Sequence, residues 1–197
     1  DAVGKGGCPA VGEDQEEIIH RRLRGIHNHL PGMKENEPFI RENLEIASLV
    51  GQDRVLIRLD HNGNPATTEV FGRLKRTIES IKGLDVLILD PLSKFYGLNE
   101  NDNACGNAWI ALLESLVVDY NLSVIFAHHE SKSQNSSGRL ESSAGRGAGS
   151  FRDGIRYALS LEKMSAEEGK RHGIKNYREI VKVLPTKTNY TAQSSGV

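Results

Sequence analysis

The 197-residue chain has little cysteine, no long apolar run and almost no net charge. Its two cysteines, Cys8 and Cys105, lack the spacing of metal ligands. So few cysteines in a chain of this length are typical of a reducing compartment, and we expect a cytoplasmic protein. No stretch approaches the roughly 20 apolar residues of a membrane helix, so no membrane partner is expected. A net charge of −1 excludes a histone-like coat of positive charge but leaves room for a local basic channel.

Apolar periodicity predicts an alternation of helices and strands. Stripes at helical spacing predict helices over residues 14–30, 68–82 and 104–120. Short apolar or alternating runs predict strands over residues 7–11, 54–59, 84–90, 123–128, 155–161 and 177–184. At the first helix, Asp14 and Glu17 resemble a capping box.

The order of these elements predicts an α/β fold. Strand, helix and strand between residues 84 and 128 form a βαβ unit, whose strands lie parallel. The two late strands, joined by a charged turn over residues 167–176, are expected to add an antiparallel hairpin. The length suits one large domain over residues 1–197, and the Ser- and Gly-rich stretch at 131–149 is expected to be a mobile loop.

Polar clusters follow three of the expected strands. Glu13 and Asp14 follow the first strand, Asp90 ends a buried strand, and His128 and His129 follow the next. Parallel strands gather their carboxyl ends at one edge of the sheet, so these clusters should converge there. A carboxylate for Mg²⁺, a second carboxylate that polarises water and a histidine near phosphate are what phosphoryl transfer requires. Taken singly, each cluster also fits a helix start or a turn.

The sequence resembles RepA-type hexameric plasmid replicative helicases, which belong to the RecA-like P-loop ATPases. The resemblance covers nearly the whole chain in order, and it is carried by five segments. These are Glu13–Arg24 after the first strand, Leu87–Leu92 as a Walker B strand, Val124–Lys132 with its His-His pair, Ala144–Gly149, and Thr186–Tyr190. It implies a RecA-like three-layer domain with a mostly parallel central sheet and an antiparallel C-terminal extension.

The resemblance also implies roles for individual residues. Glu13 would orient the attacking water, Asp90 would bind Mg²⁺, and Asp14 would lie near the ATP cofactor. His128 or His129 would sense the γ-phosphate. Arg146 and Lys187 would act near phosphate, including the nucleotide of a neighbouring subunit, although each also fits a solvated surface position.

The implied partners are single-stranded DNA and further copies of the chain in a hexameric ring. The 131–149 loop falls where RecA-like motors carry their DNA-binding loops, and it contains Lys132 and Arg139 but no aromatic residue. Because base stacking needs aromatic platforms, this composition favours contact with the DNA backbone. The arginines Arg21, Arg22 and Arg24 fit a solvated helix face better than a DNA site.

The family's phosphate-binding loop is missing from these residues. A Walker A loop has the pattern Gly-x-x-x-x-Gly-Lys-Ser/Thr between a strand and a helix, and the nearest candidate, Val3–Gly6, lacks most of it. We therefore expect that the chain starts after the P-loop strand and helix, and that it is inactive alone. The alternative is a degenerate relative that has lost nucleotide chemistry.

Three hypotheses about function follow from the sequence. The first is a helicase-like motor that couples ATP hydrolysis to movement on single-stranded DNA. The second is a non-catalytic RecA-like scaffold or regulatory subunit. The third is a metal-dependent phosphoesterase that uses Glu13, Asp90 and His128, which is weakened because no His-x-Asp or paired-Asp cluster accompanies them.

Overall fold

Four parallel strands form the largest sheet of the computed structural model, which describes residues 7–129, 151 and 153–189. The strand order is β2-β1-β5-β7, and all three neighbouring pairs are parallel. The strands are β1 (Gly7–Val11), β2 (Ala47–Ser48), β5 (Val86–Asp90) and β7 (Ser123–Phe126). The predicted α/β class and the βαβ unit that joins β5 to β7 through α5 (Asn103–Tyr120) are confirmed.

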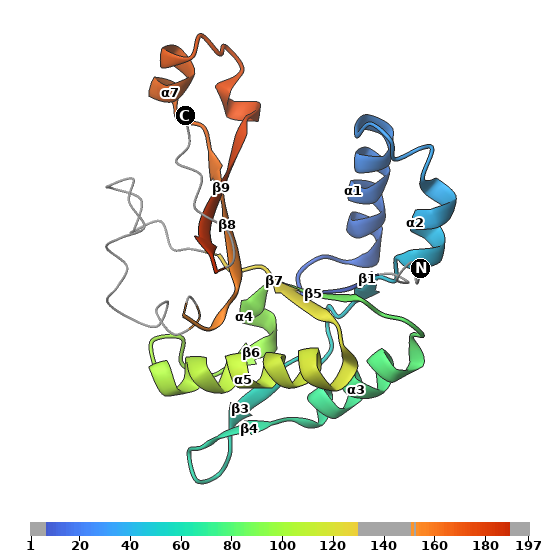
Figure 1. Cartoon of the computed structure of the whole chain (residues 1–197), viewed down its shortest axis with the longest axis vertical. Helices are drawn as coiled ribbons and strands as arrows, with labels where there is room; N and C mark the ends of the chain where they lie inside the picture. The colour runs from blue at the N-terminus through green and yellow to red at the C-terminus, as the bar shows by residue number, and fades with distance from the viewer. Residues whose placement is uncertain (1–6, 130–150, 152, 190–197) are drawn as a thin grey trace.

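The core lies between this sheet and two helices. α5 begins where the Asp102 carboxylate accepts hydrogen bonds from the first free backbone amides, and it ends at Asn121 in the left-handed conformation. Its Trp109 and Leu116 are fully buried, and Leu87 and Leu89 of β5 pack in the same cluster. α3 (Glu69–Ser80) adds Ile78, and α3 lies beside α5 (Figure 1).

One face of the parallel sheet is therefore covered. On β7, the side chains of Val124 and Phe126 pack against the core, whereas Ile125 from the opposite face is 54% exposed. The described residues thus show one helical layer on the sheet clearly, and the three-layer arrangement stays a prediction.

A second, three-stranded sheet was not predicted. It consists of β3 (Ile57–Leu59), β4 (Pro65–Thr67) and β6 (Tyr96–Gly97) in the order β4-β3-β6. Gly97 allows β6 to approach, because a Cβ there would lie 2.7 Å from Val55 Cγ1 and 2.9 Å from the Ile57 carbonyl oxygen. The strand expected over residues 54–59 is thus shorter and belongs to a separate sheet.

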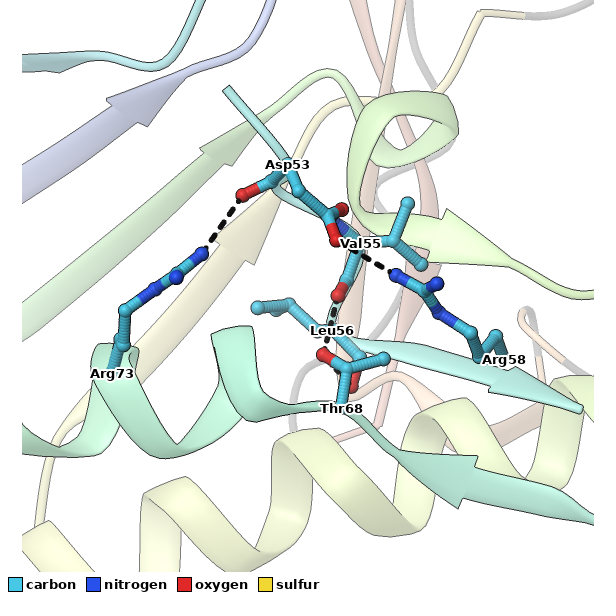
Figure 2. A network of polar contacts seen from close by, with 6 residues as sticks. All are labelled: Asp53, Val55, Leu56, Arg58, Thr68 and Arg73. Carbon is cyan, nitrogen blue, oxygen red and sulfur yellow. Dashed lines mark hydrogen bonds and ion pairs between the residues drawn. The ribbon is translucent and has the colours of Figure 1, made fainter. Parts of the chain in front are cut away.

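A polar network fastens the segment before β3 to α3 (Figure 2). Arg58 Nη2 donates to Asp53 Oδ2 at 2.9 Å, and Arg73 Nη2 donates to the Asp53 carbonyl oxygen at 3.3 Å. Thr68 Oγ1 donates to the Val55 carbonyl oxygen at 2.6 Å. The Val55 backbone N–H, followed by the Arg58 guanidinium, lowers the pKa of the Asp53 carboxyl group. The network therefore ties together three segments that only tertiary structure brings into contact.

Helices α1 (Glu16–His29), α2 (Glu37–Asn43) and α4 (Leu92–Phe95) complete the body. The predicted capping box at the start of α1 is wrong, because α1 begins after Gln15, whose side chain makes no capping hydrogen bond. The Asp14 side chain instead pairs with Arg22. Within the described residues, no helix is long and apolar enough to cross a membrane.

The C-terminal part is a two-stranded antiparallel arm that projects from the body (Figure 1). It consists of β8 (Tyr157–Lys163), α7 (Ala166–Arg171), the short 3-10 helix η2 (Tyr177–Glu179) and β9 (Val181–Thr188). The predicted antiparallel pairing is confirmed. Two details are wrong: the segment expected as a charged turn contains α7, and the final strand starts at Val181 instead of residue 177. Ser165 caps the N-terminus of α7 by forming a capping box with Glu168, so this segment begins as a helix and not as the expected turn.

Candidate active site

The carboxyl ends of β1, β5 and β7 lie at one edge of the parallel sheet. In the register of the strands, Val11 pairs with Asp90, and Leu89 pairs with Phe126. Two hydrogen bonds extend this alignment beyond the strands: Gly12 N–H donates to the Asp90 carbonyl oxygen at 2.6 Å, and Ala127 N–H donates to the Leu89 carbonyl oxygen at 3.0 Å. The polar residues that follow the strands are thereby brought to one edge, as the sequence led us to expect.

Glu13 lies between two basic side chains at this edge. Lys94 Nζ is 3.8 Å from Glu13 Oε1, and His129 Nε2 is 3.8 Å from Glu13 Oε2. Lys94 comes from α4, directly after β5, and His129 follows β7. One carboxylate therefore lies between groups from two neighbouring strand ends, and each of its oxygens has a nitrogen at 3.8 Å.

Gly12 makes the position of Lys94 possible. A Cβ on residue 12 would lie 2.7 Å from Lys94 Cβ, 2.9 Å from Lys94 Cγ and 3.4 Å from the Asp90 carbonyl oxygen. The Lys94 stem therefore crosses the bare backbone of Gly12 on its way to Glu13. Sequence reasoning missed Lys94, although its place four residues after Asp90 was a usable signal.

The two histidines have different surroundings. His128 Nε2 lies 3.5 Å from Glu100 Oε2, and the His128 ring centroid is 6.1 Å from that of the buried Phe151. His129 faces Glu13 instead. The histidine pair therefore divides between two acidic partners, and Glu100 is a second residue at this edge that the sequence did not single out.

Asp14 makes contacts that stabilise the local structure. Its carboxylate pairs with Arg22 of α1, and its carbonyl oxygen accepts a hydrogen bond from Ser48 Oγ at 2.8 Å. These contacts fasten the start of α1 to β2. The predicted role of Asp14 near a cofactor stays a prediction, and Arg22 is an ion-pair partner here.

Other predicted site residues lie elsewhere. Lys187 is on β9 in the arm, where its Nζ donates to the Asp153 carbonyl oxygen at 2.8 Å. Lys132, Arg139 and Arg146, together with the 131–149 loop, lie outside the described residues.

Asp90 is the carboxylate at this edge that could contribute to a metal site. The Asp90 carboxylate is exposed at the end of β5. Within the described part of the chain, no group of three or more His, Cys, Asp or Glu side chains could hold a metal ion. Mg²⁺ usually takes one or two carboxylates and fills its other positions with water and substrate phosphates. One exposed carboxylate, that of Asp90, at the same sheet edge as Glu13 suits that coordination.

Comparison with known families agrees with this geometry. The family model described as an AAA domain matches residues 9–135. The match includes β1, the Asp90 strand, α5 and the His-His pair, and it spans more than half of the chain. The chain therefore belongs to the AAA domain family, a family of P-loop ATPases.

Proposed function

We propose that the protein is the ATP-hydrolysing core of a replicative DNA helicase of the RepA type, acting as a ring on single-stranded DNA. The observation that carries the proposal is the meeting of Glu13, Asp90 and His129 at one sheet edge. Membership of a P-loop ATPase family supports nucleotide hydrolysis, and the order of motifs along the chain supports the helicase assignment.

In this proposal each edge residue has one task. Bound Mg²⁺–ATP supplies the transferable phosphoryl group and the cation that neutralises its charge. Asp90 contributes a carboxylate oxygen to the metal. Glu13 orients the attacking water and accepts its proton, and Lys94 and His129 hold the Glu13 carboxylate in place. His129, 3.8 Å from Glu13, is proposed to sense the γ-phosphate.

The proposal requires a phosphate-binding loop, and no Walker A pattern occurs in the 197 residues. The outer edge of β7 has no partner among the described strands. In this proposal a strand that carries such a loop pairs with β7.

The partners are proposals of the same kind. Lys132 and Arg139 are proposed to contact the DNA backbone. Arg146 and Lys187 are proposed to act near phosphate, including the phosphate of a neighbouring copy in a hexameric ring. The resemblance to RepA-type helicases supports these assignments.

The test is ATP hydrolysis by the product of the complete reading frame, with and without single-stranded DNA. Stimulation by DNA is expected, and Glu13→Gln should abolish hydrolysis while nucleotide binding persists. Asp90→Asn should weaken the dependence of binding on Mg²⁺. Asp85→Asn, at the opposite end of the same strand region, is the matched control and should behave as wild type.

Three results would contradict the proposal. Hydrolysis that DNA does not stimulate would remove the helicase assignment. A melting temperature that Mg²⁺–ATP leaves unchanged would favour a non-catalytic scaffold. Metal-dependent cleavage of phosphoesters without ATP would favour a phosphoesterase.

A further inference from the structure

The outer end of the β8–β9 arm is a small folded unit held by its own contacts. Ser165 N–H donates to Glu168 Oε2 at 2.8 Å, and Glu168 N–H donates to Ser165 Oγ at 3.2 Å. Ile174 N–H donates to the Gly169 carbonyl oxygen at 2.8 Å. Gly169 lies so close to Tyr177 that a Cβ would be 2.6 Å from Tyr177 Cβ. These contacts fix the path of the chain between the two strands.

This unit presents four basic side chains to solvent. They are Lys170, Arg171, Lys175 and Arg178, which we call the basic tip, and all four are exposed. Among the described residues, none of the four forms an ion pair with a carboxylate, whereas Lys182 on the neighbouring strand forms two. Figure 1 shows that α7 lies at the far end of the arm from the parallel sheet.

The acids of the arm compensate these charges only in part. Lys182 Nζ lies 2.7 Å from Glu168 Oε1 and 3.2 Å from Glu162 Oε2, so both carboxylates are neutralised within the arm. Residues 157–188 contain seven basic and four acidic residues, although the whole chain has a net charge of −1. The arm therefore carries an excess of positive charge. At the tip, the exposed Glu167 and Glu179 offset part of the four basic charges and leave a net positive surface.

We propose that the basic tip binds the sugar–phosphate backbone of single-stranded DNA. The proposal rests on the proposed function for the choice of single-stranded DNA, and it adds a contact surface separate from Lys132 and Arg139. Like charges held close together repel, and a polyanion relieves that repulsion while releasing its own counterions.

The composition of the tip favours nucleic acid over a protein partner. Protein interfaces are built around an apolar centre, whereas nucleic-acid interfaces are polar and strongly positive. Ile174 and Tyr177 are half-buried within the unit, and the exposed apolar side chains of the arm begin at Ile180, outside the basic tip, and continue along the strands. The Arg178 guanidinium lies 5.8 Å from the centroid of the Tyr177 ring, so this ring is not a free platform for base stacking. The expected contact is therefore with phosphates and is independent of base sequence.

The experiment measures binding of a fluorescent oligothymidylate to the full chain over a series of salt concentrations. The test variant carries Lys170→Gln, Arg171→Gln, Lys175→Gln and Arg178→Gln. The control variant removes the same charge from exposed positions on the body, with Arg24→Gln, Lys34→Gln, Arg76→Gln and Lys82→Gln. The slope of log K against log salt should become less negative by about 3 in the test variant, about 0.7 for each lost phosphate contact. The control should keep the wild-type slope, and both variants should keep the wild-type melting temperature.

Several outcomes would overturn the proposal. These are no binding by the wild type, an unchanged slope in the test variant, equal losses in both variants, or tip-dependent binding that is as tight for duplex DNA of equal length. A change in molecular mass by light scattering without a change in DNA binding would assign the tip to a second copy of the chain. Tip-dependent DNA binding by a protein that does not hydrolyse ATP would refute the proposed function and leave this inference standing.

Discussion

Lys94 Nζ lies 3.8 Å from Glu13 Oε1 and reaches it across the backbone of Gly12. The contact joins the residues that follow β1 to the one-turn helix that follows β5. It gives Glu13 a basic neighbour from the strand end that also carries Asp90. Four expected outcomes test this edge, the arm and the core.

Replacing Lys94 should disturb the position of Glu13 and leave the binding of ATP almost unchanged. Lys94→Met removes the charge that faces Glu13 while keeping most of the stem, so kcat for ATP hydrolysis by the product of the complete reading frame should fall by about 10²-fold with little change in KM. Lys94→Arg should restore most of the loss. Lys82→Met, at an exposed position on the body, serves as the control. An unchanged kcat in Lys94→Met would show that Glu13 does not need this partner.

A side chain at residue 12 should damage the edge. Gly12→Ala places a Cβ within 2.9 Å of two Lys94 atoms, so Lys94 or the backbone must move, and we expect a loss of about 1–3 kcal/mol in the free energy of unfolding. The control is Gly25→Ala in α1, where a Cβ meets nothing within 4 Å. Because alanine favours helices, Gly25→Ala should stabilise the protein by about 0.5–1 kcal/mol. Urea denaturation measures both changes, and equal effects would refute the steric argument.

The link between α7 and β9 should be sensitive to acid. The Lys182 ammonium group, followed by hydrogen bonds from Ser165, lowers the pKa of the Glu168 carboxyl group to about 2 from a usual 4.5. Because the pKa is lower in the folded protein, the stabilisation is fully present above about pH 4.5 and is lost as the pH falls towards 2. Glu168→Gln should remove it at every pH. Amide hydrogen exchange over Ala166–Arg171 should then become faster at neutral pH.

The matched control for that experiment lies on the same helix. Glu167→Gln removes one negative charge from an exposed position next to Glu168, and exchange over α7 should stay as in the wild type. Equal acceleration by both substitutions would mean that charge alone, and not the contact with Lys182, holds the helix.

The single tryptophan reports on the core. Trp109 is fully buried, and its Nε1 has no hydrogen-bond partner among the described residues. Trp109→Ala should cost about 3–5 kcal/mol of unfolding free energy. Trp109→Phe should cost clearly less, because it keeps most of the ring volume and removes an unpaired buried N–H group. Far-ultraviolet circular dichroism in urea measures both, and equal losses would show that the indole N–H is satisfied in solution.

The sequence was sufficient for the elements whose signals are local. The stripe of α5 and the buried run of β5 predicted both elements within about two residues, and the βαβ rule then gave the parallel pairing. From that pairing followed the meeting of Glu13, Asp90 and His129. Their chemical roles, and a single domain over residues 1–197, stay predictions.

The remaining features depend on contacts between distant segments. The sheet of β3, β4 and β6 needs Gly97 to fit against Val55, and no periodic pattern announces such a contact. Lys94 becomes a site residue only because Gly12 lies beneath its stem. The sequence predicts a charged turn in place of α7, because the six residues of α7 are too few for an apolar stripe. The capping box at Ser165 is the local signal that indicates a helix there.

The arm is attached to the body at a sensitive place. Phe151 is buried beside the rings of Tyr96 and His128, and Gly154 lies against Ile110 of α5, so a Cβ there would be 2.6 Å from Ile110 Cγ2. The free part of the arm starts only a few residues later, at Tyr157. The arm therefore joins the body beside His128, whose neighbour His129 faces Glu13. The packing that anchors the arm and the carboxyl end of β7 thus share one region of the molecule.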